Sequence, residues 1–203
     1  MKLDRGVYLE LTSAPANLQR SLAICLASAI ISLIVVVDLF SAAVDYVVKE
    51  LPLITQMLIQ SGASEQDISN FNEAISLLIN QPTNFYTSLT GIAGEVLIAL
   101  LGLAIQVGVI YLVINKLLRR QSRWQDILVV VGFSSIPVFF MLPSLFASSV
   151  VFKAIIILTL SLFALLTLGS GLKQVNSLRN VETVLVVLAS LVVPNILAPL
   201  IGF

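Results

Sequence analysis

The chain has 203 residues, of which 58% are hydrophobic and 11% are charged, and its basic and acidic side chains balance. Soluble domains have roughly 25% charged residues and about 45–50% apolar residues. This chain has far fewer charged residues and more apolar ones, so its composition excludes a soluble protein and indicates a membrane protein. The zero net charge gives no reason to expect a nucleic-acid partner. With no histidine and a single cysteine, the chain lacks the side chains for histidine-based catalysis, the usual zinc sites or an internal disulfide.

Five apolar runs are long enough to cross a bilayer, which takes about 20 residues in a helix. They do not alternate with period two, as the strands of a membrane barrel do. A first span this long, preceded by acidic residues, is not expected to be a cleaved signal peptide. The sequence therefore predicts an all-α membrane protein, a single domain over residues 1–203, with a five-helix bundle. The spans are expected at about 22–48, 92–114, 124–147, 150–168 and 181–201.

Before the first span, a mildly amphipathic segment predicts a short piece at the membrane interface. Between the first two spans, the sequence predicts two helices, at about 52–61 and 64–80. Pro52 suits the first turn of one helix, and Ser64 with Asp67 offers a capping box for the other. We expect an amphipathic helical hairpin outside the membrane. It would either cap the end of the bundle or serve as a lid or docking surface.

Lysines and arginines gather on one side of the predicted spans. Nine of the 11 precede the first span or lie in the loops after the second and fourth spans. Because such residues concentrate in cytoplasmic loops, we expect a cytoplasmic N-terminus and an external C-terminus in the cell membrane. The loop after the second span either only sets this topology or also contacts anionic lipids or an acidic partner. The candidate contacts are Lys116, Arg119, Arg120 and Arg123.

Four ionisable residues fall at similar depth in the outer half of the predicted bundle: Asp38, Asp45, Glu95 and Lys153. Such groups are costly in a membrane, usually face inward and often mark function. Pairing of Lys153 with Asp38 or with Glu95 would offset the desolvation cost. Alternatively, the carboxylates form cation or proton sites. Gln106 lies deeper, where a hydrogen bond between helices is expected.

The third and fifth spans contain residues that break helices. Pro137 falls near mid-bilayer, and a proline frees the carbonyl four residues before it. We expect a nearby serine such as Ser134, or a neighbouring helix, to satisfy that carbonyl, and Gly132 to let another helix approach closely at the kink. Pro194 followed by Asn195 repeats this pattern in the fifth span. We expect both spans to be kinked and Asn195 to face protein.

Three stretches resemble one known family. The third span is entered through "RRQSRWQDILVVVGFSSIP", and the fourth leads into "LTLGSGLKQVNSLRNVETVLVV". With five spans, a cytoplasmic N-terminus and "APANLQRSL" before the first span, the chain resembles the Yip family of membrane proteins that interact with Ypt/Rab GTPases. That family commonly has Gly-Tyr and then a proline in its third span. Here Gly132 and Pro137 match, and Phe133 replaces the tyrosine.

The resemblance implies a non-enzymatic protein of membrane traffic. Eukaryotic members act between the ER and the Golgi and bind prenylated small GTPases, and they usually have a long cytosolic region before the first span. The corresponding region is short here, so the chain looks like a prokaryotic member and small-GTPase binding is not expected.

Two classes of function stay open. The first is a scaffold, adaptor or membrane-organising protein that contacts partners through its cytoplasmic loops or through a second copy of itself. The second is a transporter or channel for ions or small solutes that uses the acidic residues of the outer half. Broken helices at membrane depth are typical of transporters, whereas the chain has no internal repeat. No catalytic motif is present, so we expect neither an enzyme nor a bound cofactor or metal.

Overall fold

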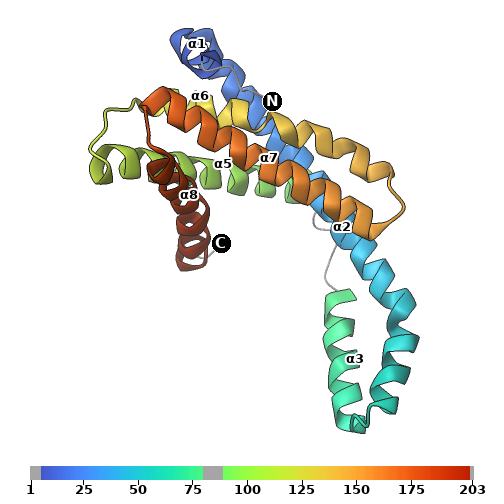
Figure 1. The fold of residues 1–203 in the computed structure, drawn as a ribbon. Coiled ribbons are helices and arrows are strands. Elements are labelled where there is room, and N and C mark those ends of the chain that lie inside the picture. Colours follow the sequence, from blue (N-terminus) through green and yellow to red (C-terminus); the bar gives the residue numbers. More distant parts are fainter. Residues whose placement is uncertain (1–5, 80–88, 202–203) are drawn as a thin grey trace.

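The computed structural model describes residues 6–79 and 89–201, and over these ranges every regular element is a helix (Figure 1). The all-α prediction is therefore confirmed. Four helical stretches are long and apolar enough to cross a membrane, and they correspond to the first four predicted spans. The α-helices are α1 (Val7–Ser13), α2 (Ala16–Gln60), α3 (Glu65–Ile79), α5 (Leu89–Leu112), α6 (Trp124–Ser134), α7 (Val150–Asn176) and α8 (Asn180–Ile201). A π-helix, η1 (Val113–Leu117), extends α5, and a 3₁₀-helix, η2 (Ile136–Phe146), follows α6.

The first predicted span and the helix predicted at 52–61 are one continuous helix, α2, with Pro52 in its interior. The prediction that Pro52 begins a new helix is wrong. A helix already nucleated by the preceding turns propagates at one hydrogen bond per residue, so losing a single donor at a proline does not force a new start. At 45 residues and 1.5 Å of rise per residue, α2 is about 68 Å long.

Helix α3 returns alongside the last turns of α2 after a tight connection (Figure 1). Gly62 in this connection has a φ of 83°, a left-handed conformation that glycine adopts without steric cost. The expected capping box follows. The Asp67 backbone N–H donates to Ser64 Oγ over 3.2 Å, and the Ser64 backbone N–H donates to Asp67 Oδ2 over 3.1 Å. These two bonds satisfy backbone groups that a helix start leaves unpaired.

The start of α3 should be sensitive to acid. Hydrogen bonds from the Ser64 hydroxyl and backbone N–H lower the pKa of Asp67 below its usual value of 3.8. Because the folded pKa is the lower one, this contribution to stability is complete above the unfolded pKa and is lost as the pH falls through the folded pKa. We expect amide hydrogen exchange in the first turn of α3 to lose protection over that acidic range. Asp67→Asn should abolish the pH dependence, and Glu73→Gln, further along the same helix, should preserve it.

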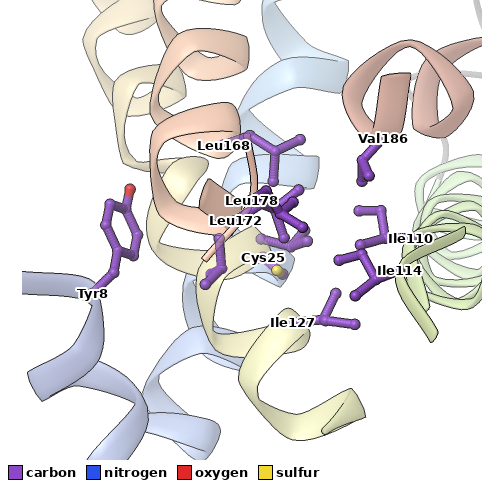
Figure 2. Packing of buried hydrophobic residues seen from close by; sticks show 11 residues of the cluster. Tyr8, Cys25, Ile110, Ile114, Ile127, Leu168, Leu172, Leu178 and Val186 are labelled. Carbon is purple, nitrogen blue, oxygen red and sulfur yellow. The ribbon is translucent and has the colours of Figure 1, made fainter. Parts of the chain in front are cut away.

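The best-packed part of the core lies at one end of the bundle, near the α5–α6 and α7–α8 connections. Side chains from α1, α2, α5, η1, α6, α7 and α8 meet there (Figure 2). The fully buried members are Ile110, Ile114, Ile127, Val130, Leu172 and Val186. At this end, α8 turns away from α7 and crosses α5 (Figure 1). Farther along the bundle, α2 and α7 pack against η2.

Candidate functional site

An ion pair joins α2 to α7 in the half of the bundle farther from the main core. Lys153 Nζ lies 2.6 Å from Asp38 Oδ2, and the Lys153 side chain is only 7% exposed while that of Asp38 is 33% exposed. Of the four residues in the expected polar cluster, Asp38 and Lys153 are in contact in the part of the chain that the structure describes. Asp45 is exposed, and the side chain of Glu95 lies outside the described part. The carboxylate of Asp38 offsets part of the desolvation cost of the buried Lys153 ammonium.

The α-helix of the third span ends shortly before Pro137. Its last residue is Ser134, a turn follows at Ser135, and the chain continues as the 3₁₀-helix η2 through Pro137 and Pro143. The α-helical hydrogen bond that Pro137 would donate cannot form, so the ladder changes register there. At 11 residues, η2 is much longer than the usual 3₁₀ piece of about 3–4 residues.

The sequence predicted that a serine at this break would bond the freed carbonyl of Phe133, but the hydroxyls of both serines bond other carbonyls. Ser134 Oγ donates to the Val130 carbonyl over 2.6 Å, and Ser135 Oγ donates to the Val131 carbonyl over 3.0 Å. Each hydroxyl therefore bonds the carbonyl four residues back on its own helix, the nearest acceptor for a helical serine. The break is bridged from α7 instead.

Thr167 of α7 reaches the end of α6. Its Oγ1 lies 3.2 Å from the Ser134 carbonyl, and 2.8 Å and 3.1 Å from the Ala164 and Phe163 carbonyls of its own helix. The single hydroxyl proton is therefore shared among three acceptors. Thr167 is buried. This contact from a neighbouring helix serves the Ser134 carbonyl and not the Phe133 carbonyl for which the sequence analysis expected a partner.

Gly132 lies where α2 and α6 approach most closely. A Cβ at this position would be 2.6 Å from both the Cβ and the backbone oxygen of Ser21, a separation that real Cβ atoms essentially never show. Ser21 is fully buried. The expected close approach at Gly132 is thus present, and its partner is the N-terminal end of α2.

Helix α1 is anchored on the bundle by Tyr8. The ring lies over Gly171 of α7, where a Cβ would meet Tyr8 Cε1 at 2.9 Å. Because the Ser134 hydroxyl already donates to Val130, the Tyr8 hydroxyl donates to Ser134 Oγ, 3.4 Å away. Burial raises the pKa of Tyr8 above its usual value of 10.0, and the hydrogen bond with Ser134 lowers it in part. Sequence reasoning missed this anchor, whose one signal was a lone aromatic residue in the short amphipathic segment.

Removing the Tyr8 ring should release α1. For a buried aromatic residue, truncation to alanine costs about 3–5 kcal/mol, whereas Tyr8→Phe loses only a hydrogen bond worth about 1 kcal/mol. We expect Tyr8→Ala to raise amide exchange throughout α1 and Tyr8→Phe to change it little. The matched control is Tyr46→Ala, because Tyr46 is exposed on α2. Equal exchange in Tyr8→Ala and Tyr46→Ala would show that Tyr8 does not hold α1.

A cleft of about 340 Å³ opens between α2, α5 and the broken third span. Gln106 lies on one wall, and the hydroxyls of Ser28, Ser32 and Ser135 lie on the others. The side chains that line it carry no Asp, Glu, Lys or Arg. The cleft therefore offers neutral hydrogen-bonding groups at membrane depth, separate from the Asp38–Lys153 pair.

The basic loop is partly committed to internal contacts. Arg120 lies 3.5 Å from Glu182 of α8, and the Asn115 side chain both accepts from the Ser122 N–H and donates to the Ser122 carbonyl. The side chains that stay exposed around this loop are Lys116, Arg119 and Arg123. Of the four basic candidates, these three remain open to a headgroup or a partner.

The fifth predicted span is not broken as the third span is. Helix α8 is one uninterrupted α-helix through Pro194. Asn195 is exposed on the single chain, and its Nδ2 donates to the Leu191 carbonyl over 2.7 Å. The prediction that Asn195 faces protein is wrong because its amide finds an acceptor on its own helix and needs none on a neighbour.

Comparisons with protein-family models, curated proteins and solved structures give no match. The site is thus characterised by its own geometry. Within residues 6–79 and 89–201, no three Asp, Glu or Cys side chains come close enough to hold a metal ion. Among the described side chains, the polar groups that meet inside the bundle include the Asp38–Lys153 ion pair, the hydroxyls around the break and the lining of the neutral cleft.

Proposed function

We propose that this chain is a non-enzymatic membrane scaffold or adaptor of the Yip type. The observation that carries the proposal is the length of α2. A hydrocarbon core about 30 Å thick accommodates about 20 residues of a helix, and α2 has 45. The surplus forms a stiff arm, continuous with the first span and braced by α3. Such an arm holds a docking surface at a fixed distance from the bilayer.

One face of this arm presents apolar side chains to solvent. Leu53 and Met57 are both exposed, and their spacing of four residues places them on one stripe of the helix. The exposed residues of α3 are mostly polar, Asn70 and Glu73 among them, with Leu77 as an exposed large hydrophobic exception. An exposed apolar stripe beside a polar surface is typical of a protein-interaction site.

The proposed topology has five spans, with α8 as the fifth. The N-terminus and the α5–α6 and α7–α8 connections are cytoplasmic, following the excess of basic residues there, and the α2–α3 arm is an external hairpin. The membrane is the cell membrane, or the ER or Golgi membrane in a eukaryote. The Gly132–Pro137 motif and the segment around Lys173 support assignment to the Yip type.

Site-specific photo-crosslinking in native membranes tests this function. A photoreactive residue at Met57, on the apolar stripe, should give discrete protein adducts, and one at Asn70, on the polar face of the arm, should give few. A second probe at Arg123 tests for a partner on the cytoplasmic side. Adducts with lipid alone at both Met57 and Arg123 would refute a scaffold.

A second function, transport of a small polar solute, is favoured by the cleft around Gln106. A transporter needs polar groups at membrane depth on a route that opens to water. Gln106 and the three serine hydroxyls supply such groups, and the broken third span lies beside them. This function predicts that solute crosses liposomes at a rate that depends on Gln106.

A further inference from the structure

A groove of about 640 Å³ lies between α7 and α8, apart from the cleft and the ion pair. It exists because α8 turns away from α7 after their connection (Figure 1). Most of its wall is apolar, and its polar residues gather at the end near the connection. The apolar lining includes Leu162, Leu165, Leu166, Val184, Val187 and Leu188, and the polar end is formed by Ser170, Lys173, Asn180 and Thr183.

We propose that this groove binds one anionic phospholipid, with the phosphate at Lys173 and an acyl chain along the apolar wall. The inference is independent of the scaffold function.

The polar end can receive a phosphate. Lys173 is exposed and donates to Asn180 Oδ1 over 2.6 Å, which fixes the ammonium at the groove mouth. An ammonium has three donors, so two remain for an anion, and the Asn180 amide adds two N–H groups. The acidic residue nearest in sequence, Glu182, does not line the groove. Its carboxylate accepts from the Arg179 N–H and lies near Arg120.

The length of the groove matches one leaflet. Its lining along α7 runs from Leu162 to Lys173, about 16 Å of helix at 1.5 Å per residue. Half of a hydrocarbon core about 30 Å thick is about 15 Å. The groove has a cation at the level of the lipid headgroups and an apolar wall about as long as one leaflet is thick. These two features fit a phospholipid better than a soluble anion, because a soluble anion would not contact the apolar wall.

The charge at the mouth favours a lipid with net negative charge. A choline or ethanolamine headgroup brings its own cation beside Lys173, whereas a phosphatidylglycerol headgroup brings none. One basic residue near an anionic lipid contributes about fivefold in binding. We therefore expect phosphatidylglycerol to bind about fivefold more tightly than phosphatidylcholine with the same acyl chains.

Native mass spectrometry of the purified full chain, titrated with each lipid, tests the proposal. Lys173→Gln should reduce phosphatidylglycerol binding to the level of phosphatidylcholine, and Lys173→Arg should retain most of it. Val184→Trp fills the groove at an exposed position and should weaken binding of both lipids. Lys49→Gln, the same change at an exposed lysine of α2 that does not line the groove, is the control and should bind as the wild type does.

Two results would overturn the proposal. If Lys49→Gln lowers binding as much as Lys173→Gln does, the lipid responds to the overall charge of the chain and not to the groove. If glycerol phosphate displaces the lipid at equal concentration, the site recognises a free phosphate and the apolar wall contributes nothing. Melting temperatures of the variants, measured without added lipid, show whether each chain is folded before its binding is compared.

Discussion

Gly132→Ala should markedly destabilise the bundle. The added Cβ would lie 2.6 Å from the backbone oxygen of Ser21, and a backbone atom cannot rotate away as a side chain can. Helices α2 and α6 must separate, which loosens the contacts around Cys25 and Val131 on either side. Overpacking of a tight core typically costs 1–3 kcal/mol, occasionally more, and the rigid partner here places this variant at about the upper end.

The matched control is Gly108→Ala. Gly108 is also within a helix, but a Cβ there meets nothing within 4 Å. Alanine has a higher helix propensity than glycine by about 1 kcal/mol, so this variant should be as stable as the wild type or more stable. Unfolding of both variants in mixed detergent micelles, followed by circular dichroism, measures the difference. Equal stabilities would mean that α2 and α6 are not in backbone contact at Gly132.

Asp38→Asn should lower the stability of the bundle more than Lys153→Gln does. It leaves the ammonium of Lys153 buried without a counter-charge, and breaking a buried ion pair costs about 3–5 kcal/mol. Lys153→Gln should cost less, because Asp38 is one-third exposed and part of its charge reaches solvent or headgroups. The asymmetry follows from burial and not from charge.

The double variant Asp38→Leu/Lys153→Leu separates a structural pair from a functional one. Replacing both members of a buried ion pair with apolar residues is often neutral or stabilising, so we expect it to recover most of the loss seen in Asp38→Asn. Asp45→Asn, two helical turns along α2 and exposed, should change the stability by less than about 0.5 kcal/mol. If Asp38→Asn proves no less stable than Asp45→Asn, the Asp38–Lys153 bond does not hold α2 to α7.

The features that could be predicted from the sequence follow from one-dimensional patterns. Long apolar runs fix where four spans lie, and the capping box fixes where α3 begins. The Asp38–Lys153 contact was one of two pairings open to Lys153, because matched depth in the membrane restricts the partners of a buried charge. The close approach at Gly132 was also expected from the residue type.

The features that could not be predicted depend on geometry between helices. Pro52 stays inside α2 because of helix cooperativity, which a local turn signal does not report. The contacts of Tyr8 depend on the packing of α6 against α7, because Ser134 lies on α6 and Gly171 on α7. Asn195 bonds its own helix, a choice that hydropathy does not distinguish. The α7–α8 groove exists because the two helices diverge, and the crossing angle of two apolar runs is not encoded in their lengths.

The central claim is that the polar groups inside this bundle hold helices together and do not form a path for solutes. Ion and small-solute flux across liposomes containing the purified chain tests it most directly. The account predicts that flux through the wild-type chain equals that of protein-free liposomes, and that Gln106→Leu, which makes the cleft apolar, changes nothing. Selective flux through the wild-type chain that disappears in Gln106→Leu would contradict it.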